Sequence, residues 1–411
     1  MATSPHSPLR KFPTSGFVVL DATKKIEEED VPSYVPEDYY PVYIGEVFRS
    51  RYQVVTKLGF GVNSTVWLCR DLREHRYLTL KMRVRTKEHD LVDLHSDREI
   101  TINEHLKSNS IEHLGKDIVR RVLDSFEIAS PNGNHKCMLY QPLGMSFTDY
   151  LRLLPQNRFP KDLAQRSVQL LLIALDYLHQ CHIVHTDISP NNVLQKIEDD
   201  SIISQIEKGE LERPIARKVL SDRTIYKSRP MPLSTGPPVL CDLGEARVGT
   251  QKHRGDIMPG IYRAPEVILG MDWDSKVDIW AIGVMTWDLL EGGHLFFARK
   301  NRILDDEQHL AEMVSLLGPP PPEFLKRSEK CYQYWDNQGN WKGSVPIPDQ
   351  SFEIREQWLH GEDRALFLQF LRRMLCWMPE ERPVAEELAF DEFLMQPHAT
   401  AFSGTSTETL T

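Results

Sequence analysis

The sequence predicts an α+β fold of two lobes, a small antiparallel β-rich lobe with one main helix, followed by a larger and mainly α-helical lobe. In residues 52–84, apolar and β-branched residues alternate or cluster between glycines and charged turns, which is typical of antiparallel strands. Beyond residue 160, apolar residues recur at helical spacing over long segments. A chain of 411 residues is long enough to bury the cores of both lobes.

Residues 1–40 are predicted to form an extended, partly disordered leader. They combine prolines, serines and the acidic run Glu27 to Asp30, and they show little periodicity. The N-terminus has no apolar core of a signal peptide, and the longest apolar-rich stretch, residues 279–290, is too short to span a bilayer. We therefore expect a soluble protein that is not secreted and does not bind membranes.

The small lobe is expected over residues 41–143. Residues 52–84 should form three strands, and residues 97–108 a helix, because Ile100, Ile102 and Leu106 are spaced as on one helical face. Residues 137–140 return to strand character before Pro142. The small lobe should end at that proline.

The large lobe is expected over residues 144–398. Helices should cover residues 163–178, 277–290, 306–317 and 365–376. The charged, proline-rich segment of about residues 195–238 has little core pattern, and we expect a surface insertion there. Residues 399–411 are rich in Ser and Thr and should be a disordered tail.

The composition argues against several classes of function. The formal net charge is −10, with 59 acidic and 49 basic residues, so no general affinity for nucleic acid is expected. The six cysteines have neither CxxC pairs nor zinc-ligand spacing, which favours reduced thiols in an intracellular protein. We expect a monomer in the cytoplasm or nucleus. One local exception is a basic stretch in the insertion, a candidate localisation or docking element: Arg213, Arg217, Lys218, Arg223, Lys227 and Arg229.

A glycine pair marks the first candidate for phosphate binding. In Leu58-Gly-Phe-Gly-Val-Asn-Ser-Thr-Val66, Gly59 and Gly61 lie at a predicted strand turn, where backbone N–H groups can approach a polyphosphate closely. An ordinary hairpin turn explains the same pair. Lys81 follows the apolar residues of the next strand, where a cation needs an anion to neutralise it, either a phosphate or a carboxylate. Glu99 on the following helix can pair with Lys81, or it is a solvated carboxylate.

The strongest signal is His185-Thr-Asp-Ile-Ser-Pro-Asn-Asn192. Asp187 and Asn192 lie five positions apart on one tight loop, so Asp187 can accept or orient a substrate hydroxyl while Asn192 holds magnesium. Asp242, after the apolar Val239 and Leu240, is the second candidate magnesium ligand.

Further downstream, Glu266 in Gly260-Ile-Tyr-Arg-Ala-Pro-Glu266 is a candidate buried carboxylate, and Arg382 a distant cation that can pair with it. The order and spacing of these motifs match one architecture, the bilobal protein kinase fold. The reaction expected is transfer of the γ-phosphate of ATP to a Ser or Thr hydroxyl of a protein, with ATP and Mg²⁺ as cofactors.

The chain from about residue 40 to residue 394 resembles eukaryotic protein kinases. Residues 40–48, 58–68, 185–188 and 242–244 are similar to the SR-protein-specific Ser/Thr kinase family, as a divergent fungal-type member. The insertion stands where that family has a spacer, and Thr186 replaces the arginine that grips a phosphorylated activation loop. Thr250 is the one hydroxyl residue between Asp242 and Glu266 besides Tyr262. The resemblance therefore implies activity without activation-loop phosphorylation.

The resemblance also implies a hinge at residues 140–143. Backbone groups of Gln141 and Leu143 should bind adenine, although Pro142 lacks a donor. Three further side chains are expected to line the adenine slot: Val66, Leu80 and Leu194.

Four positions depart from the family's pattern, one in the catalytic loop and three in the groove for the substrate. Ser189 stands where Ser/Thr kinases have a lysine that contacts the transferring phosphate. Gly293, Gln308 and Ser315 stand where the family has acidic residues in the groove that binds Arg-rich substrates. A basic substrate can still find four acidic residues close by: Asp305, Asp306, Glu307 and Glu312. The alternative is that these four residues form a solvated helix face.

The expected partner is a protein substrate, and Arg/Ser-rich proteins are among the candidates. Two other functions stay open, a pseudokinase that serves as a binding scaffold, suggested by Ser189, and a small-molecule kinase.

Overall fold

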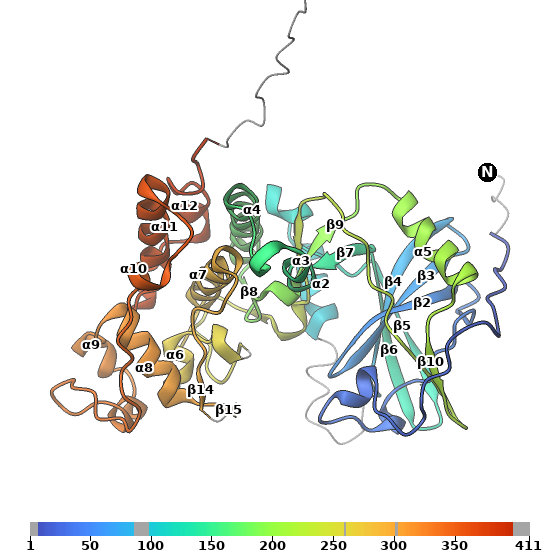
Figure 1. The fold of residues 1–411 in the computed structure, drawn as a ribbon, viewed down its shortest axis with the longest axis horizontal. Helices are drawn as coiled ribbons and strands as arrows, with labels where there is room; N and C mark the ends of the chain where they lie inside the picture. Colours follow the sequence, from blue (N-terminus) through green and yellow to red (C-terminus); the bar gives the residue numbers. More distant parts are fainter. Residues whose placement is uncertain (1–6, 86–97, 259, 301–302, 398–411) are drawn as a thin grey trace, which may run out of the picture. The chain divides into compact units, whose positions relative to one another are not determined.

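The computed structural model describes residues 7–85, 98–258, 260–300 and 303–397 (Figure 1). The chain divides into two compact units. Unit 1 comprises residues 1–150 and 177–251, and unit 2 comprises residues 151–176 and 252–411. Every residue that the sequence analysis assigns to nucleotide, metal or catalysis belongs to unit 1.

Unit 1 is built on a six-stranded antiparallel sheet in the order β1-β2-β3-β4-β6-β5. The meander predicted for residues 52–84 is present as β2, β3 and β4, and β6 contains the strand predicted at residues 137–140. The sequence analysis missed β5, which pairs with β6 along its whole length. The strands are β1 (Val47–Phe48), β2 (Tyr52–Gly61), β3 (Ser64–Asp71), β4 (Arg76–Arg83), β5 (Asp124–Ser130) and β6 (Gly133–Tyr140).

The main helix of this part of the chain is α2 (Arg98–Ser108), and its predicted first residue, Asp97, lies outside the described residues. Ile102 and Leu106 are buried, as their spacing predicts. The ring Nε2 of His105 lies 2.8 Å from the carbonyl of Cys181, and the Asn103 amide bonds both backbone groups of Val122 at 3.1 Å. These side chains fix α2 to the segment that precedes β5 and to Cys181.

Short strands that follow the six-stranded sheet in the sequence position the loops that contain Asn192 and Asp242. β7 (Leu143–Ser146), β9 (Val193–Lys196) and β12 (Pro238–Leu240) form a three-stranded sheet, and β8 (Ile183–Val184) pairs with β13 (Arg247–Val248). Because β9 follows Asn192 and β12 precedes Asp242, their antiparallel pairing, with Leu240 opposite Val193, brings these two residues to the same edge.

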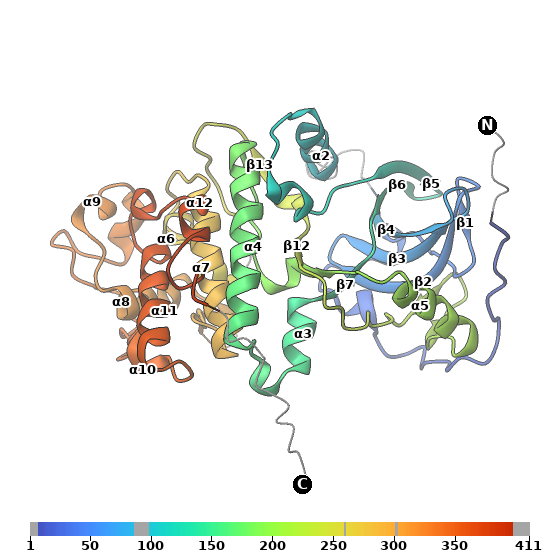
Figure 2. The same ribbon diagram turned by 90° about the horizontal axis from the view of Figure 1, so that it is seen from above.

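The insertion at residues 195–238 is ordered and covers part of the sheet. It contains α5 (Ser201–Glu212) and the hairpin of β10 (Arg217–Val219) and β11 (Thr224–Tyr226). Ile203 and Ile206 of α5 pack against Val55 and Leu68, so α5 lies beside β2 (Figure 2). These isoleucines are three positions apart, and burying them explains why a charged segment folds onto the sheet.

Several basic residues of the insertion are engaged within the chain, and the hypothesis of a localisation or docking element stays a prediction. Lys218 is buried and binds Glu29 at 2.7 Å, and Arg229 binds the buried Glu210 at 2.6 Å. Lys227 lies 3.6 Å from Glu27. These three cations are already neutralised by carboxylates of unit 1.

The described part of the leader, residues 7–40, is extended but not disordered. It contains two short 3-10 helices, Glu27–Asp30 and Pro36–Asp38. Val19 pairs with Arg217 of β10, and Glu27, Glu28 and Glu29 are buried. The acidic run, which composition alone assigns to a disordered segment, is held by lysines of β2 and of the insertion.

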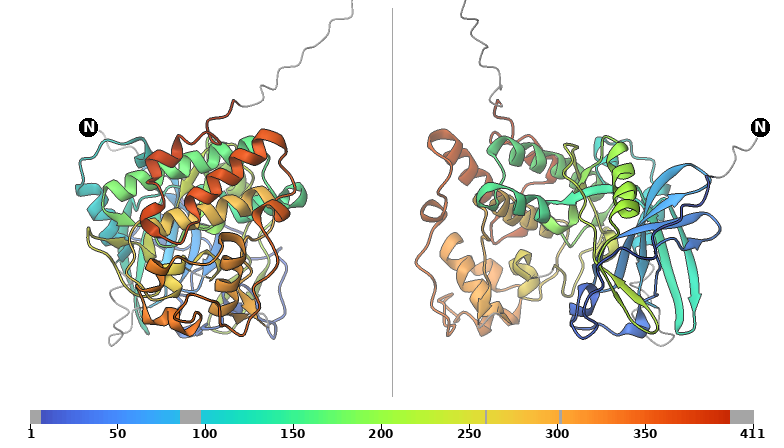
Figure 3. Two further views of the ribbon diagram at one scale, coloured as in Figure 1. Left: turned by 90° about the vertical axis from the view of Figure 1, so that its left-hand side faces the viewer. Right: turned by 45° about the vertical axis from the view of Figure 1, so that its right-hand side comes forward.

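Unit 2 is mainly helical. The helix α7 is buried along nearly its whole length and packs against α11 (Figure 3). α8 has the bounds that the sequence predicts, and Asp305 caps its first turn by accepting the N–H of Gln308. The α-helices that lie wholly or partly in this unit, with its short hairpin strands, are α3 (Phe147–Leu153), α4 (Lys161–Gln180), α6 (Pro265–Ile268), α7 (Lys276–Glu291), β14 (Arg299–Lys300), β15 (Ile303–Leu304), α8 (Asp306–Leu317), α9 (Pro322–Leu325), α10 (Phe352–Arg355), α11 (Gly361–Met374) and α12 (Ala385–Ala389).

All six cysteines are free, as the sequence predicts. Among the described residues, no helix combines the length and the apolar character that crossing a bilayer requires.

Candidate active site

The glycine pair lies on a β-hairpin. Gly59 pairs with Val66 and Gly61 with Ser64 across β2 and β3, and a bulge falls between Lys57 and Gly59. A Cβ atom added at Gly59 would meet no other atom within 4 Å, so space lies open beside the backbone there. A phosphate-binding turn needs this free approach to its N–H groups.

Lys81 on β4 contacts Glu99, as predicted, and also Asp242, which the sequence analysis assigned to magnesium alone. Its Nζ lies 2.9 Å from Oε2 of Glu99 and 3.1 Å from Oδ1 of Asp242. Burial alone would lower the pKa of Lys81, but Glu99 and Asp242 outweigh it and raise the pKa. Lys81 in turn lowers the pKa of Asp242 to about 2. Lys81 and Asp242 are therefore both charged at neutral pH.

Tyr140 at the end of β6 holds the other oxygen of Glu99. Its hydroxyl donates to Oε1 of Glu99 at 2.6 Å. Burial, then the charge of Glu99, raises the pKa of Tyr140 well above its usual value, so the phenol remains a donor. The sequence analysis missed this role, because no spacing along the sequence connects Tyr140 to α2.

The loop residues Asp187 and Asn192 are in direct contact. The Asn192 amide nitrogen donates to Oδ2 of Asp187 at 2.7 Å and to its backbone carbonyl at 2.9 Å. Among the described residues, Oδ1 of Asp187 is buried and has no hydrogen-bond partner. Burial raises the pKa of Asp187 to about 7, although the bond from Asn192 lowers it. A buried acceptor without a donor is suited to a substrate hydroxyl.

Two residues next to Asp187 hold the loop in place. The fully buried His185 accepts the N–H of Asp187 at its Nδ1, and its Nε2 lies 3.0 Å from the carbonyl of Cys241. Thr186 has φ of +65° and donates its hydroxyl to the carbonyl of Glu245 at 2.7 Å. The ring of His185 thus links the Asp187 loop to the residue before Asp242.

A cavity of about 250 Å³ brings most of the predicted residues together. Its lining includes Gly61, Val66, Lys81, Glu99, Asn192, Leu194 and Asp242. Residues that the sequence analysis did not assign complete it: Phe60, Ser64, Arg120, Tyr140, Asn191 and Cys241.

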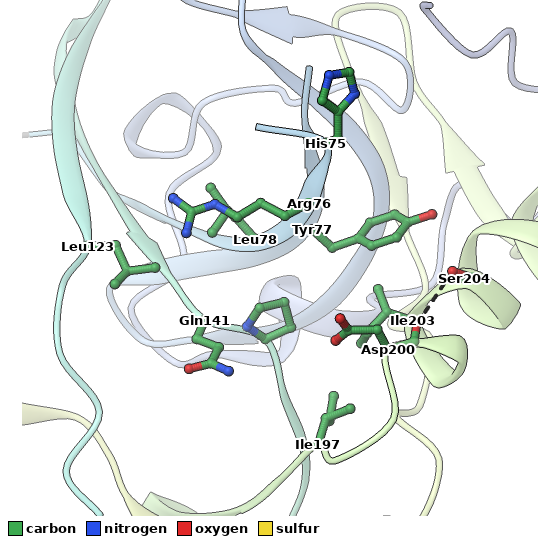
Figure 4. Close-up of a pocket in the computed structure, with 11 residues that line it drawn as sticks. His75, Arg76, Tyr77, Leu78, Leu123, Gln141, Ile197, Asp200, Ile203 and Ser204 are labelled. Atoms are coloured by element: carbon green, nitrogen blue, oxygen red, sulfur yellow. Dashed lines mark hydrogen bonds between the residues drawn. The ribbon is translucent and has the colours of Figure 1, made fainter. Parts of the chain in front are cut away.

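The remaining predicted residues lie outside that lining, and Asp187 is one of them, although it is bonded to Asn192 of the lining. Leu143 packs against Leu194 and Cys241, whereas Leu58 packs in the cluster of Val55 and Leu68, and Gly59 is one position from the bulge. The side chain of Gln141 lines a second cavity of about 470 Å³ beside Tyr77 and α5 (Figure 4). The backbone of Gln141, and not its side chain, is therefore available to the nucleotide site.

The prediction that Leu80 lines the adenine slot is wrong. Leu78, Leu80 and Met82 belong to one core cluster, while Lys81 lines the cavity. Successive side chains of a strand point to opposite faces, so Leu80 faces the core, and Thr79 shares the face of Lys81.

The donor set fits magnesium. Asn192 uses its amide nitrogen on Asp187, which leaves the amide oxygen for a cation, and the carboxylate of Asp242 is ionised. Mg²⁺ prefers oxygen ligands and is usually held by one or two protein groups besides waters and phosphates. Asn192 and Asp242 therefore suffice for the protein's share.

In unit 2, the predicted pair of Glu266 and Arg382 is present. Arg382 is fully buried and donates from Nη1 to Oε1 at 2.6 Å and from Nη2 to Oε2 at 2.8 Å. Such a two-point bond between a guanidinium and a carboxylate is the strong form of this pair.

The acidic residues near α8 are already engaged. Asp306 binds Arg263 at 2.6 Å, and the Glu307 carboxylate accepts from Ser344. Glu312 is buried and accepts the N–H groups of Phe297 and Ala298. Each of these three residues therefore has a partner within unit 2, and Glu312 alone of the three is buried.

Comparison with known proteins identifies this arrangement. The family described as "Protein kinase domain" matches residues 52–394. The chain is a member of the protein kinase family. A serine/threonine protein kinase of Aspergillus fumigatus is 46% identical over 396 residues, which cover 95% of this chain and 96% of that protein.

More distant relatives confirm the resemblance to SR-protein kinases. The serine/threonine-protein kinase SRPK of Physarum polycephalum is 32% identical over 88% of this kinase and 90% of its own length. A solved structure of a kinase domain superposes with a TM-score of 0.67 at 23% identity, covering 87% of this chain and 99% of that one, which confirms the bilobal kinase fold. The chain is thus a serine/threonine protein kinase by family and fold.

Proposed function

We propose that this kinase transfers the γ-phosphate of ATP to Ser or Thr residues of protein substrates, Arg/Ser-rich ones included, and that it is an active enzyme. The observation that carries the proposal is the connected set of Tyr140, Glu99, Lys81 and Asp242 around one cavity, with the Asp187–Asn192 pair at its edge. A scaffold without turnover would have no need of an intact base, lysine and metal ligands.

Each residue has a role that its contacts support. Lys81, held by Glu99, positions the α- and β-phosphates, and Asn192 and Asp242 hold magnesium. Magnesium, when bound, neutralises charge on the phosphates. Asp187 orients the substrate hydroxyl and accepts its proton through the oxygen that has no partner among the described residues.

Ser189 supports the loop in place of the usual lysine. It is buried, and its carbonyl accepts the N–H of Asn192 at 3.0 Å. The position therefore orients a metal ligand but supplies no charge to the transferring phosphate. We expect a lower kcat than a lysine there would give, with an intact mechanism.

Arg/Ser-rich proteins are the substrate class to test first, because relatives named as SR-protein kinases match along most of the chain. The net charge of −10 favours a basic substrate. Carboxylates other than Asp306, Glu307 and Glu312 would have to bind its arginines, since these three are engaged.

The test is magnesium-dependent transfer from labelled ATP to Arg/Ser, Pro-directed and acidic peptides. Wild type is compared with Asp187→Ala, and Asp176→Ala serves as a control for a carboxylate outside the site. Transfer to the Arg/Ser peptide that is lost with Asp187 supports the proposal. Transfer to another peptide changes the substrate class, and no transfer at all favours the pseudokinase.

A further inference from the structure

A guanidinium occupies part of the wall where the nucleotide base should lie. Arg120 lines the same cavity as Val66, Lys81 and Leu194. Its carbon Cζ lies 4.6 Å from the centre of the Tyr140 ring. The cation therefore lies over an aromatic face inside the site, which stabilises it there.

The backbone around Arg120 is fixed to the strand before Asp242. The N–H of Arg120 donates to the carbonyl of Leu240 at 2.8 Å, and the N–H of Leu240 donates to Ile118 at 2.7 Å. These two bonds anchor both sides of the residue. The position of the Arg120 backbone is therefore set by the fold, and its guanidinium contacts Tyr140 and Gln141.

Arg120 also bonds the backbone group predicted to recognise adenine. Its Nη2 donates to the carbonyl of Gln141 at 3.1 Å. The next residue, Pro142, has no N–H. An adenine base would need the Gln141 carbonyl as acceptor for its 6-amino group, and this acceptor is already used.

The same arginine leaves a donor unpaired. Its Nε is buried and has no hydrogen-bond partner among the residues that the structure describes. Arginine pairs well with the O6 and N7 acceptors of guanine, whereas the 6-amino group of adenine is itself a donor and would face the guanidinium unfavourably.

We propose that Arg120 determines the base preference of this site and makes GTP a phosphate donor at least as good as ATP. The proposal rests on the proposed kinase function, since it concerns the nucleotide of the same site. It specifies a 6-oxopurine nucleoside triphosphate as the additional ligand class. ATP binding would require Arg120 to release the Gln141 carbonyl, and GTP binding would not.

The test measures the dissociation constants of Mg-ATP and Mg-GTP by calorimetry, for wild type and Arg120→Met, which keeps the length of the side chain and removes its charge and donors. We expect wild type to bind GTP as tightly as ATP or more tightly. In Arg120→Met, the ratio of the two constants should move about 10-fold toward ATP, the discrimination that one good arginine–guanine contact provides. Arg121→Met, the same change at the neighbouring arginine outside the cavity lining, should leave the ratio unchanged.

A second variant keeps the test decisive if Arg120→Met does not fold. Arg120→Lys retains the charge but loses the planar fork, and it should move the ratio toward ATP by about threefold. A wild-type preference for ATP that neither variant alters would overturn the proposal and leave the kinase function standing. Absence of binding of both nucleotides to wild type and variants would overturn both.

Discussion

Lys57 offers a direct test of how the leader supports the glycine hairpin. This lysine precedes the hairpin on β2 and is fully buried. Its Nζ bonds the carboxylate of Glu28, lies 3.5 Å from Glu27 and donates to the carbonyl of Tyr226 at 3.1 Å. In Lys57→Met the two buried glutamates would lose their cation at this position.

The expected loss in the free energy of unfolding is about 3–5 kcal/mol, because removing one member of a buried ion pair leaves the other without compensation. This is a large share of the roughly 5–15 kcal/mol typical of a folded protein. The double variant Lys57→Met, Glu28→Gln should recover most of the loss, since replacing both members by neutral groups of similar size is close to neutral.

Urea unfolding of wild type, both single variants and the double variant gives the coupling energy directly. Lys227→Met is the matched control, because that lysine approaches the same Glu27 at 3.6 Å but is half exposed, and its loss should cost less than about 1 kcal/mol. A loss below about 1 kcal/mol for Lys57→Met, or a double variant no more stable than the single, would refute the reasoning. The KM for ATP should rise in Lys57→Met, since the bulge of the glycine hairpin begins at this residue.

Four other outcomes are expected. Tyr140→Phe removes the donor to Glu99 and should lower kcat about fivefold, the equivalent of one hydrogen bond of about 1 kcal/mol; an unchanged kcat with Glu99→Gln impaired would contradict this. Thr250→Ala should leave peptide phosphorylation unchanged, because Thr186 donates to Glu245 and offers no cation to a phosphate; loss of activity together with a phosphate on Thr250 would show the opposite. Glu266→Gln should cost about 3–5 kcal/mol in urea unfolding because it leaves the buried Arg382 unpaired, whereas Glu380→Gln, at the exposed pair with Arg327, should cost less than about 1 kcal/mol. The hydrogen bond and charge of Asp288 raise the pKa of His294, so this pair stabilises the fold below the unfolded pKa of about 6.5 and ceases to do so as the pH rises through the folded pKa. The contribution should stay below about 1 kcal/mol because the ring is half exposed. The difference in the free energy of unfolding between wild type and His294→Gln that comes from this pair should vanish above the folded pKa.

Local patterns were sufficient for the regular elements with strong periodicity. The buried helix α7 and the capped helix α8 lie where their apolar spacing and the aspartate before α8 predict them. The strand β5 was missed because exposed residues alternate with Phe126 and Ile128 over only seven positions. A short strand at the edge of a sheet has too few buried residues to be recognised without its partner.

The order of the motifs was sufficient to predict the contact of Lys81 with Glu99, whereas the contact of Lys81 with Asp242 was not predicted. Arg120 could not be found in this way, because its role depends on the ring of Tyr140 at the end of β6 and on the carbonyl of Gln141, which follows it, both about 20 positions away in the sequence. The prediction for Leu80 was wrong for a simpler reason. Successive side chains of a strand point to opposite faces, so the residue next to Lys81 on β4 cannot share the face of Lys81.

The ion pairs of the leader also have a consequence for synthesis of the chain. Glu29 and Lys218 are 189 positions apart, so the ribosome completes the sheet, the hinge and the Asp187 loop before the partner of Glu29 emerges. A nascent chain that stalls before Lys218 would contain all six strands with an N-terminal segment not yet fastened to β10. The bond that fastens the leader to β10 should therefore form late, after translation of the insertion.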